Sequence, residues 1–144
     1  MTYLVDSDWI VDALVGIPSA VAPLEASSPD ELSVSIITLG EIYDGAFGFP
    51  DPEAHLTTFR QFLAGFVILG LSDPIMERFA RNRALLRRQG NLIPDLDLLI
   101  AATALHHGLT LMTRNLRLFR RVPDLQVYRA ADASRQKVSQ LVAG

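Results

Sequence analysis

Short apolar runs alternate along the chain with stretches in which apolar residues recur every three or four positions. The runs at 3–5, 32–37, 67–69, 110–112 and 125–128 predict strands, because they are short, apolar and partly β-branched. The periodic stretches at 9–14, 39–47, 59–66, 73–90 and 98–105 predict helices. Residues 18–29, rich in proline and serine, predict a loop with a short helix near 21–25, and 115–121 predict a short basic turn or helix.

Local signals mark where several of these helices begin and end. Asp6 or Ser7 is placed to cap the first helix, and Asp73 followed by Pro74 is a typical helix start. Gly90 and Gly108 follow two of the helical stretches and favour their ends. The helix at 98–105 is apolar all round, which predicts a central, covered position.

Strands separated by helices imply parallel crossover connections. We therefore predict an α/β fold with a central parallel sheet of about four or five strands and helices on both faces. In such sheets a ligand binds beyond the carboxyl ends of the strands. This rule places Asp6 and the segments 35–41 and 113–115 at one edge.

The composition narrows the class of protein. The 144 residues are 49% hydrophobic and 20% charged, without repeats or a long linker, so we expect one globular domain over 1–144. The absence of cysteine excludes a thiolate zinc site, a disulfide scaffold and a cysteine nucleophile. No apolar stretch approaches the roughly 20 residues of a membrane span, and no basic residue precedes Arg60 as a leader would require. We expect a cytoplasmic protein.

Charge is distributed unevenly. Residues 1–59 contain ten acids and no lysine or arginine, whereas residues 60–144 contain thirteen bases, twelve of them arginine, and six acids. One interpretation is that the two parts attract each other across the fold. The other is an acidic metal site beside a basic surface that binds a polyanion.

Three acids occupy strand ends or helix starts: Asp6, Glu41 and Asp97. Each alone is explained by helix capping or by the helix dipole. Several carboxylates converging on one cleft would raise each other's pKa unless a divalent cation supplied positive charge. Hard oxygen ligands without thiolates favour Mg²⁺ or Mn²⁺.

Other chemistries find less support in the sequence. His106 and His107 close a helix and are interpreted as structural or surface residues. The chain has no G-x-S-x-G elbow, no phosphate-binding loop and no G-x-G-x-x-G motif after a strand. A serine hydrolase and a nucleotide-cofactor enzyme are therefore not indicated.

Four segments together resemble the PIN-domain family, and within it the VapC-type toxins of type II toxin–antitoxin systems. They are YLVDSD at 3–8, TLGEIY at 38–43, DLLIAATA at 97–104 and LTLMTRNLRLF at 109–119. The resemblance covers residues 3–128, and it is the order of the four segments that makes it specific. It implies a PIN-like three-layer fold and an endoribonuclease that uses one or two Mg²⁺ or Mn²⁺ ions.

The resemblance also implies roles for individual residues. The family's acids fall on Asp6, Glu41 and Asp97, with Asp97 or Glu41 accepting a proton during hydrolysis. Asp95 is a possible accessory ligand, and the family's fourth position falls on Asn115, which carries no charge. Hydrogen bonds to the acids are expected from the side chains of Ser7, Thr38 and Thr113.

Partners follow from the same resemblance. It implies an RNA substrate, a homodimer and a small VapB-like antitoxin whose segment lies in a groove beside the acids. The candidates to hold RNA phosphates are Arg114, Arg117, Arg120 and Arg121. The alternative is that these arginines form a solvated turn or a docking surface for an acidic antitoxin segment. Five apolar residues are assigned to core, dimer interface or groove without distinction: Leu39, Tyr43, Phe47, Phe59 and Phe62.

Two alternatives to a toxin stay open. A PIN-like nuclease outside a toxin system would use the same acids. A non-catalytic PIN-like binding module would have no need to hold mutually repelling carboxylates together.

Overall fold

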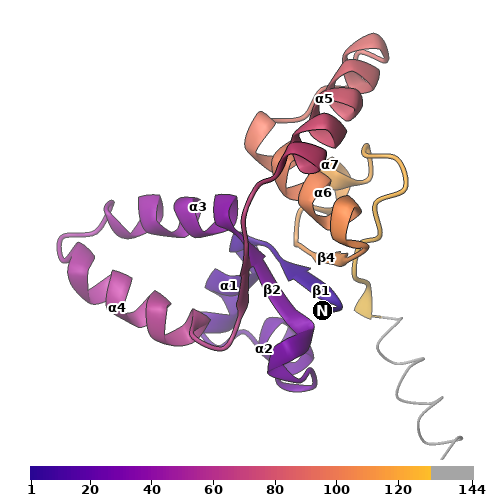
Figure 1. The fold of residues 1–144 in the computed structure, drawn as a ribbon. Helices are drawn as coiled ribbons and strands as arrows, with labels where there is room; N and C mark the ends of the chain where they lie inside the picture. The colour runs from indigo at the N-terminus through magenta and orange to yellow at the C-terminus, as the bar shows by residue number, and fades with distance from the viewer. Residues whose placement is uncertain (131–144) are drawn as a thin grey trace, which may run out of the picture.

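A four-stranded parallel sheet forms the centre of the molecule, shown in a computed structural model that describes residues 1–130 (Figure 1). Its strands are β1 (Tyr3–Val5), β2 (Leu32–Ser35), β3 (Val67–Leu69) and β4 (Thr110–Met112), in the order β3-β2-β1-β4. In register, Tyr3 pairs with both Leu32 and Thr110. The predicted α/β class is confirmed, while the part of the predicted domain at 131–144 lies outside the described residues.

Within residues 1–130, six helices and one 3₁₀ turn connect the strands, and a seventh helix follows β4. The helices are α1 (Ser7–Leu14), α2 (Pro18–Glu25), α3 (Ile36–Ala46), α4 (Pro52–Leu63), α5 (Asp73–Arg88), α6 (Asp95–His107) and α7 (Leu116–Phe119), and the 3₁₀ turn is Pro29–Glu31. None of these helices is both long and apolar enough to cross a bilayer, as far as the described part of the chain goes.

Alternating strand residues separate two hydrophobic layers, because successive side chains of a strand point to opposite faces. Val5, Val34 and Met112 pack with buried residues of α1 to α4. Leu4 and Leu111 pack on the other face with buried residues of α5 to α7. Helices therefore cover both faces, as predicted.

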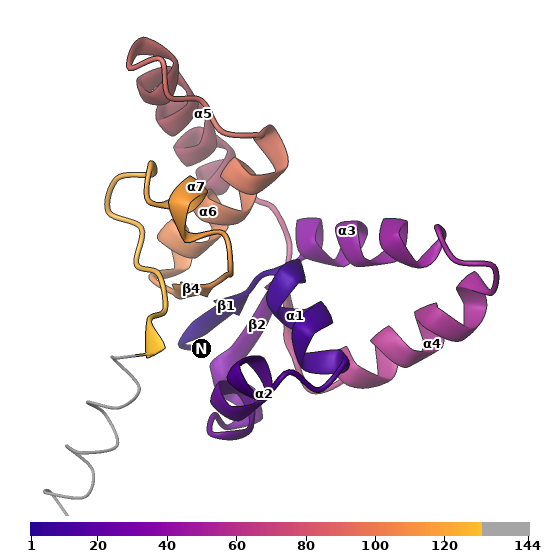
Figure 2. The same cartoon turned by 180° about the vertical axis from the view of Figure 1, so that it is seen from behind.

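Two helical segments project from this three-layer body. In Figures 1 and 2, α3 and α4 form a hairpin that extends to one side, and α5 extends away from the sheet in a different direction. The hairpin is held where the chain leaves β2, since Ser35 caps α3 by accepting a hydrogen bond from the Ile37 N–H.

The structure corrects several predicted boundaries. The short helix predicted near 21–25 begins earlier, at Pro18, and ends at Glu25, despite Pro23 in its interior. The strand predicted at 32–37 ends at Ser35, and the helix predicted from 59 begins at Pro52. The strand predicted at 125–128 is an isolated bridge between Leu111 and Val127.

Helix starts differ in detail as well. Ser72, not Asp73, caps α5 by accepting from the Ile75 N–H. The central helix α6 begins at Asp95, so both Asp95 and Asp97 lie in its first turn. Gly108, with φ 65°, ends this helix in the left-handed conformation that glycine adopts without strain.

Candidate functional site

Asp6 lies at the centre of the carboxyl edge of the sheet, between the end of β1 and the start of α1. It caps α1, because its Oδ1 accepts a hydrogen bond of 2.9 Å from the Ser7 N–H. Its Oδ2 accepts one of 2.8 Å from the Thr113 hydroxyl, at the end of the neighbouring β4. With only 5% of its surface exposed, Asp6 is a buried acid held at both oxygens. The predicted hydrogen bond from Thr113 is present.

Asp8 is a functional candidate that the sequence interpretation did not single out. It follows Asp6 by two residues in the first turn of α1, and its Oδ2 accepts a 3.0 Å hydrogen bond from the Arg114 backbone N–H. The same oxygen lies 3.4 Å from the Thr113 hydroxyl. The only available signal was the D-x-D spacing of the first segment, which is weak by itself.

Glu41 and Asp97 face this pair from α3 and α6. The negative charges of Asp6, Asp97 and Asp8 all raise the pKa of Glu41, after burial as the largest cause. The pKa of Asp97 is also raised, first by burial and then by the charge of Asp8. The fold thus brings the three predicted acids, Asp6, Glu41 and Asp97, into one electrostatic cluster.

Asp95 points elsewhere although it is only two residues from Asp97. Its Oδ1 accepts a 2.9 Å hydrogen bond from Arg83 Nε of α5, and the two side chains form an exposed ion pair. Two positions along a helix are about 200° apart, so neighbouring acids in one turn face different surroundings. The geometry separates Asp97 from Asp95, which the sequence left as alternatives.

Burial raises the pKa of every acid in the cluster, and the charge of a neighbouring carboxylate raises each one further. Burial, followed by the charge of Asp8, raises the pKa of Asp6 to about 6, against the lowering effect of its hydrogen bonds from Thr113 and Ser7. The pKa of Glu41 rises to about 7. Burial also raises the pKa of Asp8, partly offset by the Arg114 hydrogen bond. Such grouped shifts are typical of functional sites.

The other residues predicted to support the acids occupy varied positions. The Ser7 side chain lines the cleft beside Glu41. The hydrogen bond predicted from Thr38 to the acids is absent: Thr38 is fully buried, and its hydroxyl has no hydrogen-bond partner within the described residues. Asn115 is exposed at the start of α7 and donates its backbone N–H to the Thr113 hydroxyl.

The four predicted phosphate-binding arginines divide into two kinds. Arg114 is already occupied: its Nε donates to Asp12 at 3.2 Å, another guanidinium nitrogen donates to Ser19 at 2.9 Å, and its guanidinium lies over the Trp9 ring. Arg121 donates to the Leu92 carbonyl. Arg117 and Arg120 are exposed on and directly after α7, the helix that follows Thr113 and Asn115, which leaves them accessible to a polyanion.

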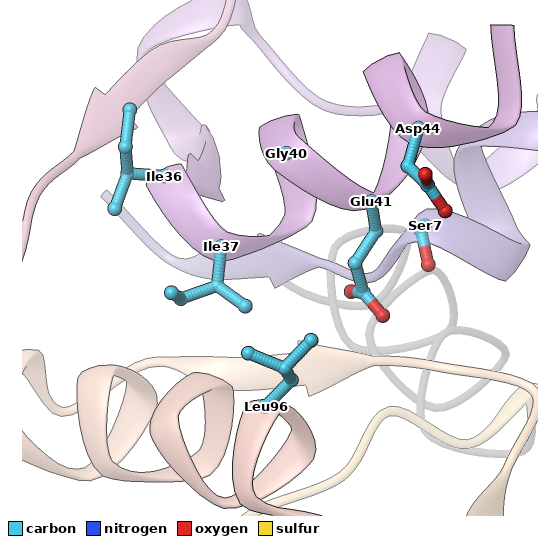
Figure 3. A pocket seen from close by; sticks show the side chains of 7 residues that line it. All are labelled: Ser7, Ile36, Ile37, Gly40, Glu41, Asp44 and Leu96. Atoms are coloured by element: carbon cyan, nitrogen blue, oxygen red, sulfur yellow. The ribbon is translucent and has the colours of Figure 1, made fainter. Parts of the chain in front are cut away.

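A cleft of about 580 Å³ opens beside the acids, between the start of α3 and the start of α6 (Figure 3). Glu41 and Asp44 point into it together with Ser7, and Ile37 and Leu96 approach each other from its two sides. A second groove of about 680 Å³ lies between α1, α3 and α4 and shares Ser7 and Glu41 with the first. The acid cluster therefore joins two openings.

The donor set suits a hard divalent cation. Glu41 Oε1 and Asp8 Oδ1 are buried and accept no hydrogen bond from residues 1–130, so both have free lone pairs. Carboxylate oxygens are the ligands that Mg²⁺ and Mn²⁺ prefer. As the side chains are placed, no three Asp, Glu or His residues among the described ones converge closely enough to surround one ion. Mutual repulsion keeps carboxylates apart, and a bound cation would draw them together.

Comparison with known proteins identifies the family. The PIN domain family profile matches residues 3–125. Ribonuclease VapC2 of Haemophilus influenzae is 31% identical, covering 88% of this chain and 96% of the relative. The tRNA(fMet)-specific endonuclease VapC of Salmonella typhimurium is 25% identical over the same shares.

Solved structures agree with the sequence relatives. The crystal structure of VapBC2 from Rickettsia felis, bound to a DNA fragment from its promoter, superposes with a TM-score of 0.83 at 27% identity, covering 89% of this chain and 98% of that one. The family profile spans most of the chain, and the acid cluster lies where the parallel strands end. These findings confirm the resemblance that the sequence indicated, and the chain belongs to the PIN-domain family.

Proposed function

We propose that this chain is a divalent-metal-dependent endoribonuclease and the toxin of a toxin–antitoxin pair. The observation that carries the proposal is that Asp6, Asp8, Glu41 and Asp97 lie near enough at the carboxyl edge of a PIN-domain sheet for their charges to raise one another's pKa. Relatives over 88% of the chain bear the names ribonuclease and tRNA-specific endonuclease, and a matching structure from Klebsiella pneumoniae, 32% identical, is a toxin–antitoxin complex by name.

The acids would hold one or two Mg²⁺ or Mn²⁺ ions. Asp6, Glu41 and Asp97 are the ligands, with Asp8 as a fourth carboxylate that the D-x-D segment adds. When bound, such an ion lowers the pKa of a coordinated water and stabilises the negative charge that develops on the phosphate. The Thr113 hydroxyl fixes the orientation of Asp6 through its 2.8 Å hydrogen bond.

Glu41 is the best placed proton acceptor. Its Oε1 accepts no hydrogen bond from the described residues and the side chain lines the cleft, so a lone pair is free to take a proton there. Arg117 and Arg120 bind phosphates that flank the cut, since both are exposed beside the site. Arg114 instead positions Asp8 through its backbone N–H.

The decisive experiment compares Asp97→Asn with Asp95→Asn in cleavage of a labelled RNA pool in Mn²⁺. Both changes remove one carboxylate from the first turn of α6, but Asp95 pairs with Arg83 at the surface. Asp97→Asn should abolish cleavage and Asp95→Asn should retain it. Equal cleavage by wild type and Asp97→Asn would refute the assignment. Absence of both metal binding and cleavage in the wild type would favour a non-catalytic binding module.

The groove between α1, α3 and α4 is the proposed antitoxin site. Its walls include Val11, Leu14 and Phe59, and it opens onto Asp8 and Glu41. An antitoxin segment with apolar side chains and a terminal cation matches both features, and it would neutralise the acids that hold the metal. The test is inhibition of the RNA cleavage by the product of an adjacent small reading frame. A cleaving protein without such a partner would instead be a PIN-like nuclease outside a toxin system.

Self-association and location complete the proposal. The free edge strand β3 exposes Val67 and Ile68, followed by exposed Leu71 and Met76, an apolar surface that a second copy would cover. Sedimentation of wild type and of Ile68→Lys distinguishes dimer from monomer. A ribonuclease toxin finds its RNA in the cytoplasm, and we place the protein there.

A further inference from the structure

The cleft between α3 and α6 has two ends of different chemistry. Ile37 of α3 and Leu96 of α6 approach each other across it, and they form apolar walls on two separate elements (Figure 3). At the other end, Ser7, Glu41 and Asp44 present oxygen atoms. Since Ser7 and Glu41 belong to the edge that holds the acid cluster, a molecule in this cleft would lie next to the reacting phosphate.

Gly40 lines this cleft, and nothing in the fold requires a glycine at its position. It is the fifth residue of α3, where glycine destabilises a helix relative to alanine. Its backbone has no left-handed conformation, and a Cβ built on it meets no atom within 4 Å. Neither the backbone nor the packing requires glycine here. What a side chain would do is enter the cleft that Gly40 lines.

We propose that this cleft is a nucleobase subsite that receives an unpaired guanine next to the cleaved phosphate. The inference rests on the proposed ribonuclease function and deepens it. Ile37 and Leu96 contact the two sides of a flat ring, and the Asp44 carboxylate offers two acceptor oxygens at the polar end. Guanine presents two adjacent N–H donors, N1–H and N2–H, on its Watson–Crick edge, and a carboxylate can accept both at once.

Charge complementarity excludes several other occupants. Asp44, which is not one of the proposed metal ligands, disfavours a phosphate or an acidic peptide at the polar end and favours a ligand that is neutral or cationic there. A paired base hides its Watson–Crick edge, which restricts the subsite to single-stranded or looped RNA. The remaining competitor is a basic side chain of a protein partner, and the experiment below separates it from guanine.

The test uses the full-length protein with a size series at Gly40. Gly40→Ala adds one methyl and improves helix propensity, whereas Gly40→Leu fills the cleft. Cut ends from a random RNA pool are sequenced first, and matched oligonucleotides then carry guanosine, inosine or an abasic nucleotide beside the cut. Inosine lacks only the N2 amino group, so it isolates one of the two hydrogen bonds.

We expect wild type to cut the guanosine substrate roughly ten- to hundred-fold faster than the abasic one, with inosine in between. Gly40→Leu should lose that difference and cut both at the slow rate, whereas Gly40→Ala keeps most of it. Asp44→Asn should reduce discrimination between guanosine and inosine. Unchanged guanosine preference in Gly40→Leu overturns the subsite. So does a Gly40→Leu protein that keeps RNA selectivity but no longer binds its antitoxin, because the cleft would then receive a protein side chain.

A binding measurement separates this inference from the proposed function. Asp97→Asn protein, alone and combined with Gly40→Leu, is titrated with guanosine and abasic oligonucleotides. Guanosine-dependent binding that Gly40→Leu removes supports the subsite even if no RNA is cut. Cleavage by wild type without any base-dependent binding or rate leaves the ribonuclease in place and refutes the subsite alone.

Discussion

The buried acid Asp6 destabilises the folded protein at neutral pH. Its pKa rises from 3.8 to about 6 on folding, chiefly through burial, so the folded state binds its proton more tightly than the unfolded state does. Stability from this group is therefore present below about pH 4 and is lost as pH rises through about 6. Glu41 acts in the same direction, with a folded pKa of about 7.

Asp6→Asn should therefore stabilise the metal-free protein while it abolishes activity. Asparagine caps a helix as well as aspartate does through its Oδ1, and its Nδ2, in place of the oxygen that accepts from Thr113, can donate to the Thr113 hydroxyl instead. We expect Tm in a chelating buffer to rise by about 3–6 °C at pH 7.5, from roughly 1–2 kcal/mol, and by only a small fraction of this at pH 4. Asp95→Asn is the matched control without the rise. A gain in Tm independent of pH would contradict the argument.

Arg114 shows how a charged residue can be used within the fold instead of for a ligand. Its ion pair with Asp12, its hydrogen bond to Ser19 and its contact with Trp9 join the end of β4 to α1 and α2. With both charged side chains about one-third exposed, these contacts together contribute about 1–2 kcal/mol.

Arg114→Ala and Arg117→Ala should therefore affect different properties, the first thermal stability and the second RNA binding. We expect Arg114→Ala to lower Tm by about 3–6 °C, because it removes those contacts. Arg117→Ala should leave Tm within about 1 °C and instead weaken RNA binding and reduce its salt dependence. Thermal unfolding and RNA titration at two salt concentrations measure both. Equal loss of RNA affinity at unchanged Tm for Arg114→Ala would return Arg114 to the phosphate-binding group.

At the scale of elements, the sequence predicted most reliably what depends on local pattern. The sheet edge and its acids Asp6, Glu41 and Asp97 follow from apolar runs that end at an acid or a helix start. Asp8 was missed because its role depends on Thr113 and Arg114, more than a hundred residues away. Which acid of the α6 turn faces the site also depended on a distant residue, the Arg83 of α5.

Helix α2 is longer than predicted because tertiary contacts override its composition. Proline and serine predict a loop with only a short helix near 21–25, yet Trp9 donates a buried 3.0 Å hydrogen bond to the Ala20 carbonyl and anchors the earlier part of the segment against α1. Ala20 and Leu24 are buried on the same face. Packing thus offsets the missing N–H of Pro23 in the helix interior.

Pro23→Ala tests this competition. Alanine restores a helix N–H and removes the ring clash, while a more flexible unfolded chain takes back part of the gain. We expect the free energy of unfolding in denaturant to rise by about 1 kcal/mol, with RNA cleavage unchanged. Ala22→Gly in the same helix is the opposing control and should lower it by a similar amount. A loss of stability in Pro23→Ala would mean that α2 requires the proline's rigidity.

At the scale of the whole molecule, the acidic first part and the basic second part are only weakly paired. Among the ion pairs in the described residues, Arg114 with Asp12 is the one that joins 1–59 to the rest. The acids of the site come from both parts, three from the first and Asp97 from the second. Attraction between the two parts therefore leaves the acid cluster uncompensated, which favours the interpretation of a metal site beside a basic surface.

A divalent cation should consequently stabilise the whole fold in a pH-dependent way. Ligands must lose their protons to bind metal, and the raised pKa values of Asp6 and Glu41 place that competition between about pH 6 and 7. We expect saturating Mn²⁺ to raise Tm by several degrees at pH 7.5 and by little at pH 5.5, and chelation to reverse the rise. In Asp97→Asn the shift should shrink, while Asp95→Asn should respond as wild type does. A cation bound at the acid cluster must compete with protons and must depend on Asp97. A Tm shift equal at both pH values and in all three proteins would therefore show that Mn²⁺ acts at the surface and not at the acid cluster.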